Sequence, residues 1–411
     1  MILIPSNVQE KINVLVGDAH AVSNTPTVVF DPLRINFLSE LSKSLFAQET
    51  FSSLPDVASF AYWCRRTNLI SLENRLGNSK LLQVGLGLSF HICPSNVPVN
   101  FAFSLAFGLL AGNTCVLRLP SKQSVTVETI LQSINALLQK PEFNDLKTAI
   151  LLIQYEHDEW VSEFWLSAAD GKVFWGGDET IDYMRSLKCR PRSREVAFSD
   201  RYSVCAIYAP DVLELNAENL QKFGHQLFND IYLMDQAACS SPQLVVWIGN
   251  AELVSQAKKK VWDMVVSIAL KQYKPDSLHL MDKFVNACMH AINNDQVLDV
   301  LQHSHVLYRI ELKNLSKDQD TCRGWYGTVH EVTLSSLDLV APIVTEKYQT
   351  LSYFGFSADQ LASFVLSNKL RGIDRVVPVG SALDIDLVWD GYNIISSLSR
   401  RIEIKQTRGI S

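Results

Sequence analysis

The chain has 411 residues, of which 47% are hydrophobic and 19% charged, with 18 Gly and 14 Pro. This length and composition exclude a disordered or fibrous protein and a small disulfide scaffold, and they predict two or three domains with buried cores. Lys and Arg number 37 against 43 Asp and Glu, a net charge of −6 without a basic block, so no nucleic-acid partner is expected.

The N-terminal segment, the most apolar stretch and the cysteines predict where in the cell the protein is found. The segment Met1–Ser6 is apolar but short and has no basic start, so no signal peptide is predicted. The most apolar stretch, residues 97–119, is broken by proline, asparagine and glycine, which favours a buried helix and strand over a membrane span. Eight scattered cysteines without CxxC pairs favour no metal site and a reducing, cytoplasmic compartment.

The first half of the chain begins with helices and then alternates strands with helices. The predicted helices of the first eighty residues are Pro32 to Phe46, Asp56 to Arg65 and a segment near Ser71. The predicted elements that follow are a strand over Leu81–Ile92, a helix over Val99–Leu110, a strand over Cys115–Leu119, a helix over Val125–Leu138, strands at Ala149–Gln154 and Val173–Trp175, and a helix after Asp178. Such serial alternation is typical of an open parallel sheet.

The second half repeats the alternation from Ser203 onward. The predicted helices are Ala217–Met234, Ala251–Gln272, Ser277–Ile292, Ala358–Ser367 and Tyr392–Leu398, and the predicted strands lie at Leu244–Ile248, Val306–Leu312, Tyr326–Leu334, Arg375–Pro378 and Ile402–Ile404. The pattern predicts two doubly wound α/β domains, residues 1–203 and 204–376, with the tail 377–411 returning to the first domain or forming an oligomerisation arm.

A Pro-x-Asn-x-Pro turn, Pro94–Pro98, lies between a predicted strand end and a helix start. Ligands of parallel sheets collect at the carboxyl ends of strands, and the two prolines fix the backbone around Asn96. The side-chain amide of Asn96 is therefore a candidate donor to a developing oxyanion, although on these residues alone a turn or N-cap role is the simpler explanation.

A glycine pair, Gly176–Gly177, lies between the strand at 173–175 and the following helix. Such a turn lets backbone N–H groups approach a phosphate, but Gly-Gly turns are common and the signal is weak alone.

The loop Asp235–Gln243 carries Cys239 among small and polar residues. A thiolate is a strong nucleophile, and such a loop gives it access. Cys93 is the one rival, because Cys115 and Cys205 lie in apolar strand runs. The alternative for any single cysteine is a buried, inert thiol.

Taken together, the three loops resemble the aldehyde dehydrogenase superfamily, and more closely its acyl-CoA reductase (LuxC-type) family. The resemblance rests on residues 85–122, on the run Cys-Ser-Ser-Pro-Gln at 239–243, and on residues 370–380 with Trp389-Asp390-Gly391. It implies an aldehyde dehydrogenase-like fold, with an NADP-binding first domain, a catalytic second domain and the active site between them.

The resemblance also implies roles for single residues. Cys239 matches the nucleophile that accepts the acyl group, and Asn96 the side-chain half of the oxyanion hole, whose other half is the backbone N–H of Cys239. Residues 116–122, with Arg118, Ser121 and Lys122, match the place where the superfamily holds the adenosine ribose. NAD-preferring members often carry a Glu there, so Ser121 and Lys122 favour NADPH.

Gly176 and Gly177 match the pyrophosphate turn of the superfamily, but the usual later glycine of that helix is replaced near Ile181. The segment Ala197–Ser203 shows no clear counterpart of the Glu that activates water in hydrolytic members. Its one carboxylate, Asp200, reads more simply as a turn residue. Without such a base, hydride reduction of the acyl-enzyme becomes the sensible direction.

We therefore expect NADPH-dependent reduction of an acyl-CoA or enzyme-bound acyl thioester to an aldehyde. The alternatives are an oxidative NAD(P)-dependent aldehyde dehydrogenase and, from another class, a non-catalytic acyl carrier loaded by an acyl-protein synthetase. The resemblance makes such a synthetase partner and a homo-oligomer plausible. Acyl chain length is not predicted, because pocket walls come from positions distant in sequence.

Overall fold

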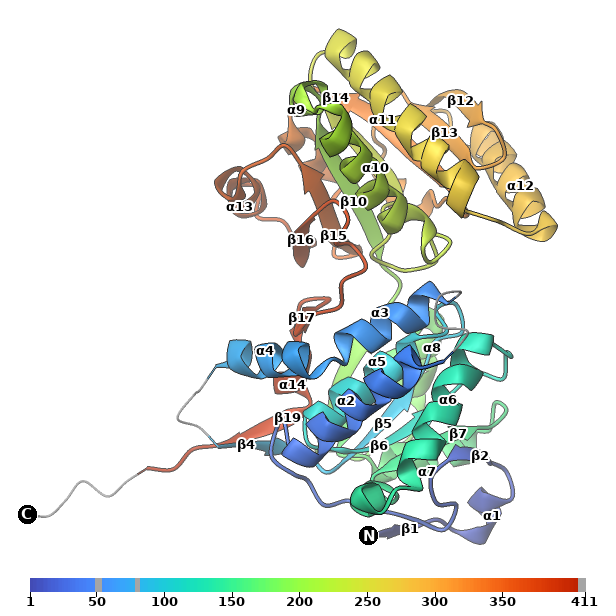
Figure 1. Cartoon of the computed structure of the whole chain (residues 1–411), viewed down its shortest axis with the longest axis vertical. Coiled ribbons are helices and arrows are strands. Elements are labelled where there is room, and N and C mark those ends of the chain that lie inside the picture. The colour runs from blue at the N-terminus through green and yellow to red at the C-terminus, as the bar shows by residue number, and fades with distance from the viewer. Residues whose placement is uncertain (49–53, 78–81, 406–411) are drawn as a thin grey trace, which may run out of the picture. The chain divides into compact units, whose positions relative to one another are not determined.

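The computed structural model describes residues 1–48, 54–77 and 82–405, which fold into two compact units. Unit 1 comprises Met1–Ser199 with the C-terminal segment from Asp386, and unit 2 comprises Asp200–Ile385. Figure 1 shows a helix-covered sheet in each unit. The boundaries lie a few residues from those expected, because the first strand of unit 2 begins at Tyr202 and residues 377–378 belong to its edge strand.

Unit 1 is built on a six-stranded sheet. In spatial order its strands are β2 (Asn13–Val16), β7 (Ile150–Gln154), β6 (Thr114–Arg118), β5 (Leu88–Ile92), β8 (Gly171–Trp175) and β9 (Arg194–Phe198). All neighbours are parallel except the edge pair of β2 and β7. The four inner strands β5, β6, β7 and β8 are buried along most of their length, as expected for a parallel sheet covered on both faces.

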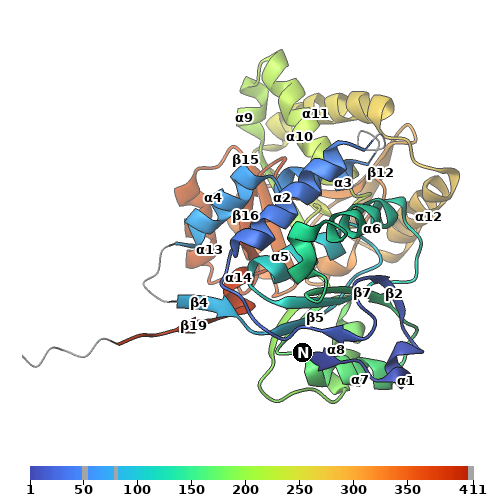
Figure 2. The same ribbon diagram turned by 60° about the horizontal axis from the view of Figure 1, so that its bottom comes forward.

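Helices cover both faces of this sheet (Figure 2). The helices of unit 1 are α1 (Ser6–Gln9), α2 (Pro32–Phe46), α3 (Pro55–Trp63), α4 (Arg66–Leu76), α5 (Asn100–Leu110), α6 (Val125–Leu138), α7 (Glu159–Ala168), α8 (Asp178–Ser186) and α14 (Ile394–Ser397). Helices α5 and α6 lie on one face and α7 and α8 on the other. Along β5, Phe90 packs with Trp165 of α7, whereas His91 bonds to Ser104 of α5.

The chain path through unit 1 creates a switch point. After β5 the chain moves outward to β6 and β7, and it then returns to the other side of β5 to form β8 and β9. In open α/β sheets, ligands bind in the crevice outside the carboxyl ends of the strands where the winding direction reverses. That crevice lies here between β5 and β8.

Short strands attach the chain ends to unit 1. They are β1 (Ile2–Leu3) paired with β3 (Ala21–Val22), β4 (Leu82–Gly85) paired with β19 (Ser399–Ile402), and β17 (Val388–Trp389) paired with β18 (Tyr392–Asn393). The antiparallel pair of β4 and β19 places the C-terminal tail beside the strand that precedes β5.

Unit 2 is built on a seven-stranded sheet. In spatial order its strands are β12 (Val297–His303), β13 (Leu307–Leu312), β14 (Thr328–Leu334), β11 (Leu244–Ile248), β10 (Tyr202–Tyr208), β15 (Tyr348–Phe354) and β16 (Arg375–Pro378). Only the edge strand β12 runs antiparallel to its neighbour.

Residues alternate between the two faces of the unit 2 sheet. The helices of this unit are α9 (Ala209–Glu214), α10 (Ala217–Tyr232), α11 (Ala251–Gln272), α12 (Ser277–Asn293) and α13 (Ala358–Ser367). Cys205 and Ile207 of β10 pack with α10 and α11 on one face. Val204 and Ala206 point to the other face and belong to the same core cluster as residues of α13. Both faces are therefore apolar and covered.

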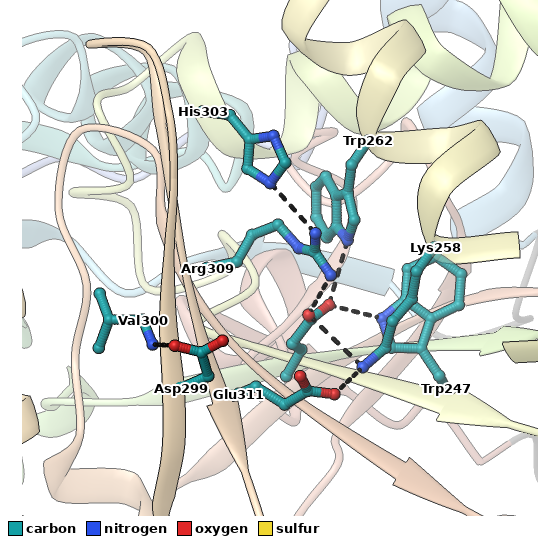
Figure 3. A network of polar contacts seen from close by, with 9 residues as sticks. Trp247, Lys258, Trp262, Asp299, Val300, His303, Arg309 and Glu311 are labelled. Atoms are coloured by element: carbon teal, nitrogen blue, oxygen red, sulfur yellow. Dashed lines mark hydrogen bonds and ion pairs between the residues drawn. The ribbon is translucent and has the colours of Figure 1, made fainter. Parts of the chain in front are cut away.

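One ionic network is buried within unit 2 (Figure 3). The carboxylate of Glu331 on β14 is fully buried and lies 2.5 Å from Arg309 and 3.5 Å from Lys258. The indole N–H groups of Trp247 and Trp262 donate to its second oxygen at 3.0 and 3.1 Å. The two cations and two indoles satisfy the buried charge.

A neutral relay links the strands and α5 in unit 1. The indole of Trp175 donates to the hydroxyl of Ser104 at 2.9 Å. The hydroxyl of Ser89 donates to the carbonyl of Thr114 at 3.1 Å, so the neutral ring of His91 donates to Ser89 from Nε2 at 2.8 Å and accepts from the hydroxyl of Ser104 at Nδ1, 2.7 Å away. Burial lowers the pKa of His91 to about 3 and keeps the ring neutral.

The structure confirms most predicted elements and corrects others. Helices α6, α11 and α13 have the predicted bounds. The single strand predicted over Leu81–Ile92 is wrong: Leu81 lies outside the described residues, and the rest forms β4 and β5. Gly87 separates them with a φ of 135°, where a Cβ would lie 2.4 Å from a carboxylate oxygen of Asp170. Strands β2, β9, β12 and β15 were not predicted.

The neutral state of His91 predicts a pH-dependent stability. Its folded pKa lies below the unfolded value, so the stabilisation exists above about pH 6.5 and is lost as the pH falls. Between about pH 7.5 and pH 5, the wild type should lose about 2 kcal/mol of unfolding free energy that a His91→Gln variant does not lose. Denaturant unfolding at the two pH values measures this. The exposed His157→Gln is the control, and an equal pH dependence of wild type and His91→Gln would contradict the assignment.

The ionic network predicts a strong effect of one substitution in unit 2. Glu331→Gln removes the charge that compensates buried Arg309 and Lys258, so it should lower the unfolding free energy by about 3–5 kcal/mol. The fluorescence of Trp247 and Trp262, which contact Glu331 directly, reports the transition. Glu311→Gln, at the partly exposed end of the network, should cost clearly less. Equal effects of the two variants would refute the central role of Glu331.

Candidate active site

Three predicted loops follow three adjacent strands of unit 1. The Asn turn follows β5, the segment with Ser121 and Lys122 follows β6, and Gly176–Gly177 follows β8. Because β8, β5 and β6 are neighbouring parallel strands, all three loops leave the same edge of the sheet. The structure therefore brings the candidate cofactor-binding residues together at the switch point.

The Asn turn is fixed from both sides of Asn96. The backbone N–H of Cys93 donates to the carbonyl of Arg118 at 3.0 Å, and Val97 and Val99 are buried. Asn96 itself is exposed between these anchors. An exposed amide on an anchored turn can hold a fixed position toward a ligand, as an oxyanion donor requires.

Cys93 lies too deep to act as the nucleophile. It is 4% exposed, and burial raises the pKa of its thiol far above the usual range. Burial likewise raises the pKa of Cys115 to about 11 and that of Cys205 to about 12. A thiol that stays protonated at neutral pH is a poor nucleophile, so these three cysteines are structural.

The end of β6 holds the expected ribose-binding residues in two different settings. The guanidinium of Arg118 lies over the ring of Tyr155, 5.1 Å from its centroid, and donates to its carbonyl at 3.2 Å. Ser121 and Lys122 are exposed. Of the three, Lys122 and Ser121 can meet a ligand directly, whereas Arg118 is bound to Tyr155.

A hollow opens between the Asn turn and the β6 loop. It is lined chiefly by Pro94, Ser95, Pro98, Phe101, Leu119 and Lys122. The walls are mostly apolar, and Lys122 adds one cation at the rim. A ligand with an apolar or aromatic body and an anionic group matches this lining.

The glycine turn exposes a helix N-terminus. Gly177 is the N-cap of α8, no side chain caps it, and nothing lies within 4 Å of the place a Cβ would occupy. The backbone is therefore open to close approach by a ligand. Asp178 and Glu179 stand in the first turn, so a phosphate would share this N-terminus with two carboxylates.

The cysteine loop connects α10 to β11 in unit 2 and is held by an amide that the sequence did not reveal. Asp235 and Gln236 have φ values of 51° and 62°, in the left-handed region. The buried side chain of Gln236 donates to the carbonyls of Pro242 and Thr328 and accepts the N–H groups of Gly327 and Thr328, at 2.9–3.1 Å. Every hydrogen-bonding position of this amide is used.

Cys239 lies half-buried on this loop with a polar residue on each side. The hydroxyl of Ser203 donates to its carbonyl at 2.7 Å, and the buried amide of Gln349 donates to its sulfur at 3.4 Å. An N–H donor to the sulfur stabilises negative charge there, as a nucleophilic thiolate needs. Gln349 has no sequence signal, because it lies 110 residues away and meets Cys239 only through the pairing of β10 with β15.

Asp200 is the carboxylate nearest the expected position of a water-activating base, and it is paired with two basic side chains. It forms ion pairs with Arg323 at 3.0 Å and Lys347 at 3.2 Å. Both oxygens of this carboxylate are thus engaged in ion pairs with side chains of unit 2.

Within residues 1–48, 54–77 and 82–405, no group of three or more His, Cys, Asp and Glu side chains is arranged to hold a metal ion. None of the helices within these ranges has the length and apolar character needed to cross a bilayer.

Comparisons with curated proteins find relatives named long-chain acyl-protein thioester reductase. The long-chain acyl-protein thioester reductase of Aliivibrio fischeri is 28% identical over 167 residues, covering 40% of this chain and 32% of that protein. The reductase of the same name from Vibrio harveyi is 22% identical over 301 residues, covering 72% and 58%. The chain thus matches about a third to somewhat more than half of the length of these relatives.

Comparisons with solved structures find aldehyde dehydrogenases. Aldehyde dehydrogenase 21 from Physcomitrella patens gives a TM-score of 0.64 at 12% identity and covers 90% of this chain and 85% of its own. A glyceraldehyde-3-phosphate dehydrogenase from Methanocaldococcus jannaschii, solved with NADP, gives 0.60 at 13% identity and covers 90% and 88%. These matches confirm the predicted aldehyde dehydrogenase-like α/β fold.

A family model described as acyl-CoA reductase (LuxC) matches residues 57–401, which include the Asn turn, the glycine turn and the cysteine loop. With most of the chain matched, and with curated relatives and fold in agreement, the protein belongs to the acyl-CoA reductase (LuxC) family.

Proposed function

We propose that this chain reduces an acyl thioester to an aldehyde through an acyl-enzyme on Cys239. The observation that carries the proposal is the environment of Cys239. This thiol is half-buried on a loop that the side chain of Gln236 holds in place, and the amide of Gln349 donates to its sulfur. The thiolate attacks the thioester carbonyl carbon, a new C–S bond forms, and the substrate thiol leaves as a thiolate. Asn96 and the backbone N–H of Cys239 are the proposed donors to the oxyanion.

The reductant is proposed to be NADPH, which when bound supplies the hydride that turns the acyl-enzyme into a thiohemiacetal. Breakdown of that species releases the aldehyde and returns the sulfur of Cys239 as a thiolate. Gly176 and Gly177 would hold the pyrophosphate by backbone N–H groups, and Ser121 and Lys122 would hold the ribose with its 2′-phosphate. The fit rests on the switch-point position of these loops, the open Gly177 and the cationic rim of the hollow.

The direction of the reaction follows from Asp200. Oxidation of an aldehyde to a free acid needs a base that activates water against the acyl-enzyme. In the segment 197–203 the one carboxylate is Asp200, which is paired with Arg323 and Lys347. This pairing favours hydride reduction over hydrolysis, and reduction over the oxidative alternative.

The identity of the acyl donor and the cellular location are also proposals. The curated relatives are named acyl-protein thioester reductases, so an acyl group carried on a protein, supplied by an acyl-protein synthetase, is a candidate donor beside acyl-CoA. A cytoplasmic location is proposed from the eight scattered cysteines, which form no CxxC pairs in the sequence. A pure acyl carrier would use Cys239 alone and would bind no NADPH.

The nucleophile predicts a clear kinetic result. Cys239→Ala should lower acyl-CoA-dependent NADPH oxidation by at least about 10³-fold, because the variant lacks the thiol proposed to form the acyl-enzyme. Absorbance of NADPH with acyl-CoAs of increasing chain length measures this. Cys93→Ala, at a buried cysteine, is the control and should retain most of the activity if it folds. A Cys239→Ala enzyme with an undiminished rate would rule out the mechanism.

The position of Lys122 at the rim of the hollow predicts a preference for NADPH over NADH. Lys122→Glu should weaken NADPH binding about 10-fold or more and leave NADH binding nearly unchanged, because the carboxylate repels only the 2′-phosphate. Cofactor fluorescence in titrations without acyl substrate gives both affinities. Lys140→Glu, an exposed lysine at the far end of α6, is the charge-matched control. Equal loss for both cofactors, or none for either, would count against Lys122 as the determinant.

A further inference from the structure

Helix α12 presents apolar side chains outward. Six large apolar residues on it are at least half exposed: Leu278, Met281, Phe284, Val285, Met289 and Ile292. Every other helix of the described chain carries at most one large apolar side chain that is exposed. Leu298 on the adjoining edge strand β12 adds a seventh, at 59% exposure. Figure 1 shows α12 beside β12 at the edge of the unit 2 sheet.

The inner face of α12 is polar, the reverse of an ordinary surface helix. Its two fully buried residues are Lys283 and Ala287. The ammonium group of Lys283 donates to the carbonyl of His305 at 3.2 Å, and the ring of His290 is 2.8 Å from the carbonyl of Arg323. Burial lowers the pKa of Lys283 to about 7. An amphipathic helix normally turns its apolar stripe to the core, so an exposed stripe indicates that another surface covers it.

Four of the five other exposed apolar residues of α12, all except Phe284, are spaced symmetrically about Val285. Leu278 and Ile292 lie seven residues on either side of it, and Met281 and Met289 lie four. When two such helices pack antiparallel around a two-fold axis at Val285, Leu278 of one copy meets Ile292 of the other, and Met281 meets Met289. The stripe is therefore complementary to itself, which is the condition for an isologous interface.

The charges around the stripe agree with this pairing. No charged residue lies within the stripe, and Asp282 stands at its margin. In the antiparallel pair, the two copies of Asp282 lie on opposite sides of the axis, roughly 9 Å apart along the helices, so their repulsion is weak. The exposed charged residues between 274 and 299 are one lysine and four aspartates, the opposite of the basic border that a membrane-binding helix carries.

The apolar area is sufficient for a stable contact. Seven side chains with half or more of their surface exposed offer on the order of 700 Å², close to the ~800 Å² that each partner contributes to a standard interface.

From the inverted helix, its symmetric spacing and its area, we infer that α12 forms a two-fold interface with α12 of a second copy of this chain. The inference is independent of the proposed function, because it uses no residue of the candidate active site.

The oligomeric mass in solution tests the interface. Light scattering after size exclusion at micromolar concentration should give an even number of subunits for the wild type and half that mass for Val285→Glu, which places two carboxylates at the axis. Leu366→Glu, at a 74% exposed position on α13, is the matched control and should not change the mass. Circular dichroism establishes that both variants are folded, and NADPH binding should remain unchanged.

A cross-link tests the register. In a Cys288→Ser background, Val285→Cys should form a reducible inter-subunit disulfide under mild oxidation, because the two copies of residue 285 meet at the axis. Leu366→Cys in the same background should not. A monomeric wild type at all concentrations, an unchanged mass for folded Val285→Glu, or equal cross-linking of the two cysteine variants would each overturn the inference.

Discussion

The side-chain amide of Gln236 holds the cysteine loop in a shape that the backbone would not adopt by itself. Two successive non-glycine residues with positive φ are unfavourable, and such a conformation persists only where the surroundings fix it. Gln236 does so with four hydrogen bonds to the turn before β14 and to Pro242. The loop therefore leaves α10 and enters β11 by one path, with Cys239 between Ser203 and Gln349.

In unit 1, the order of the strands, and not a single hydrogen-bonded side chain, places the proposed cofactor-binding turns next to each other. Because the chain passes from β5 to β7 and returns to β8, the Asn turn and the glycine turn end on adjacent strands although they lie about eighty residues apart in sequence. The neutral relay through Ser104 and His91 joins α5, β5 and β8 just behind these two turns. The same core that stabilises unit 1 thus also sets the spacing between the proposed oxyanion donor and the proposed pyrophosphate turn.

The sequence predicted the features that depend on local pattern. Helices with clear periodicity, such as α6 and α11, have the predicted bounds, and the loops with Asn96 and Gly176 follow strands as expected. The family resemblance is confirmed, whereas the roles of the single site residues stay predictions. The inner strand β15 was missed because its run Tyr-Gln-Thr-Leu-Ser-Tyr-Phe mixes polar and apolar residues without clear alternation. Gln236 and Gln349 could not be found, because glutamines carry no motif and their contacts depend on strand pairing.

The most direct measurement is the mass of the protein after incubation with a long-chain acyl-CoA in the absence of NADPH, followed by peptide mapping. If Cys239 is the nucleophile, one acyl adduct forms on the peptide that contains Cys239, and it is lost on addition of NADPH with release of the matching aldehyde. No adduct, an adduct on another cysteine, or discharge as a free fatty acid would contradict it.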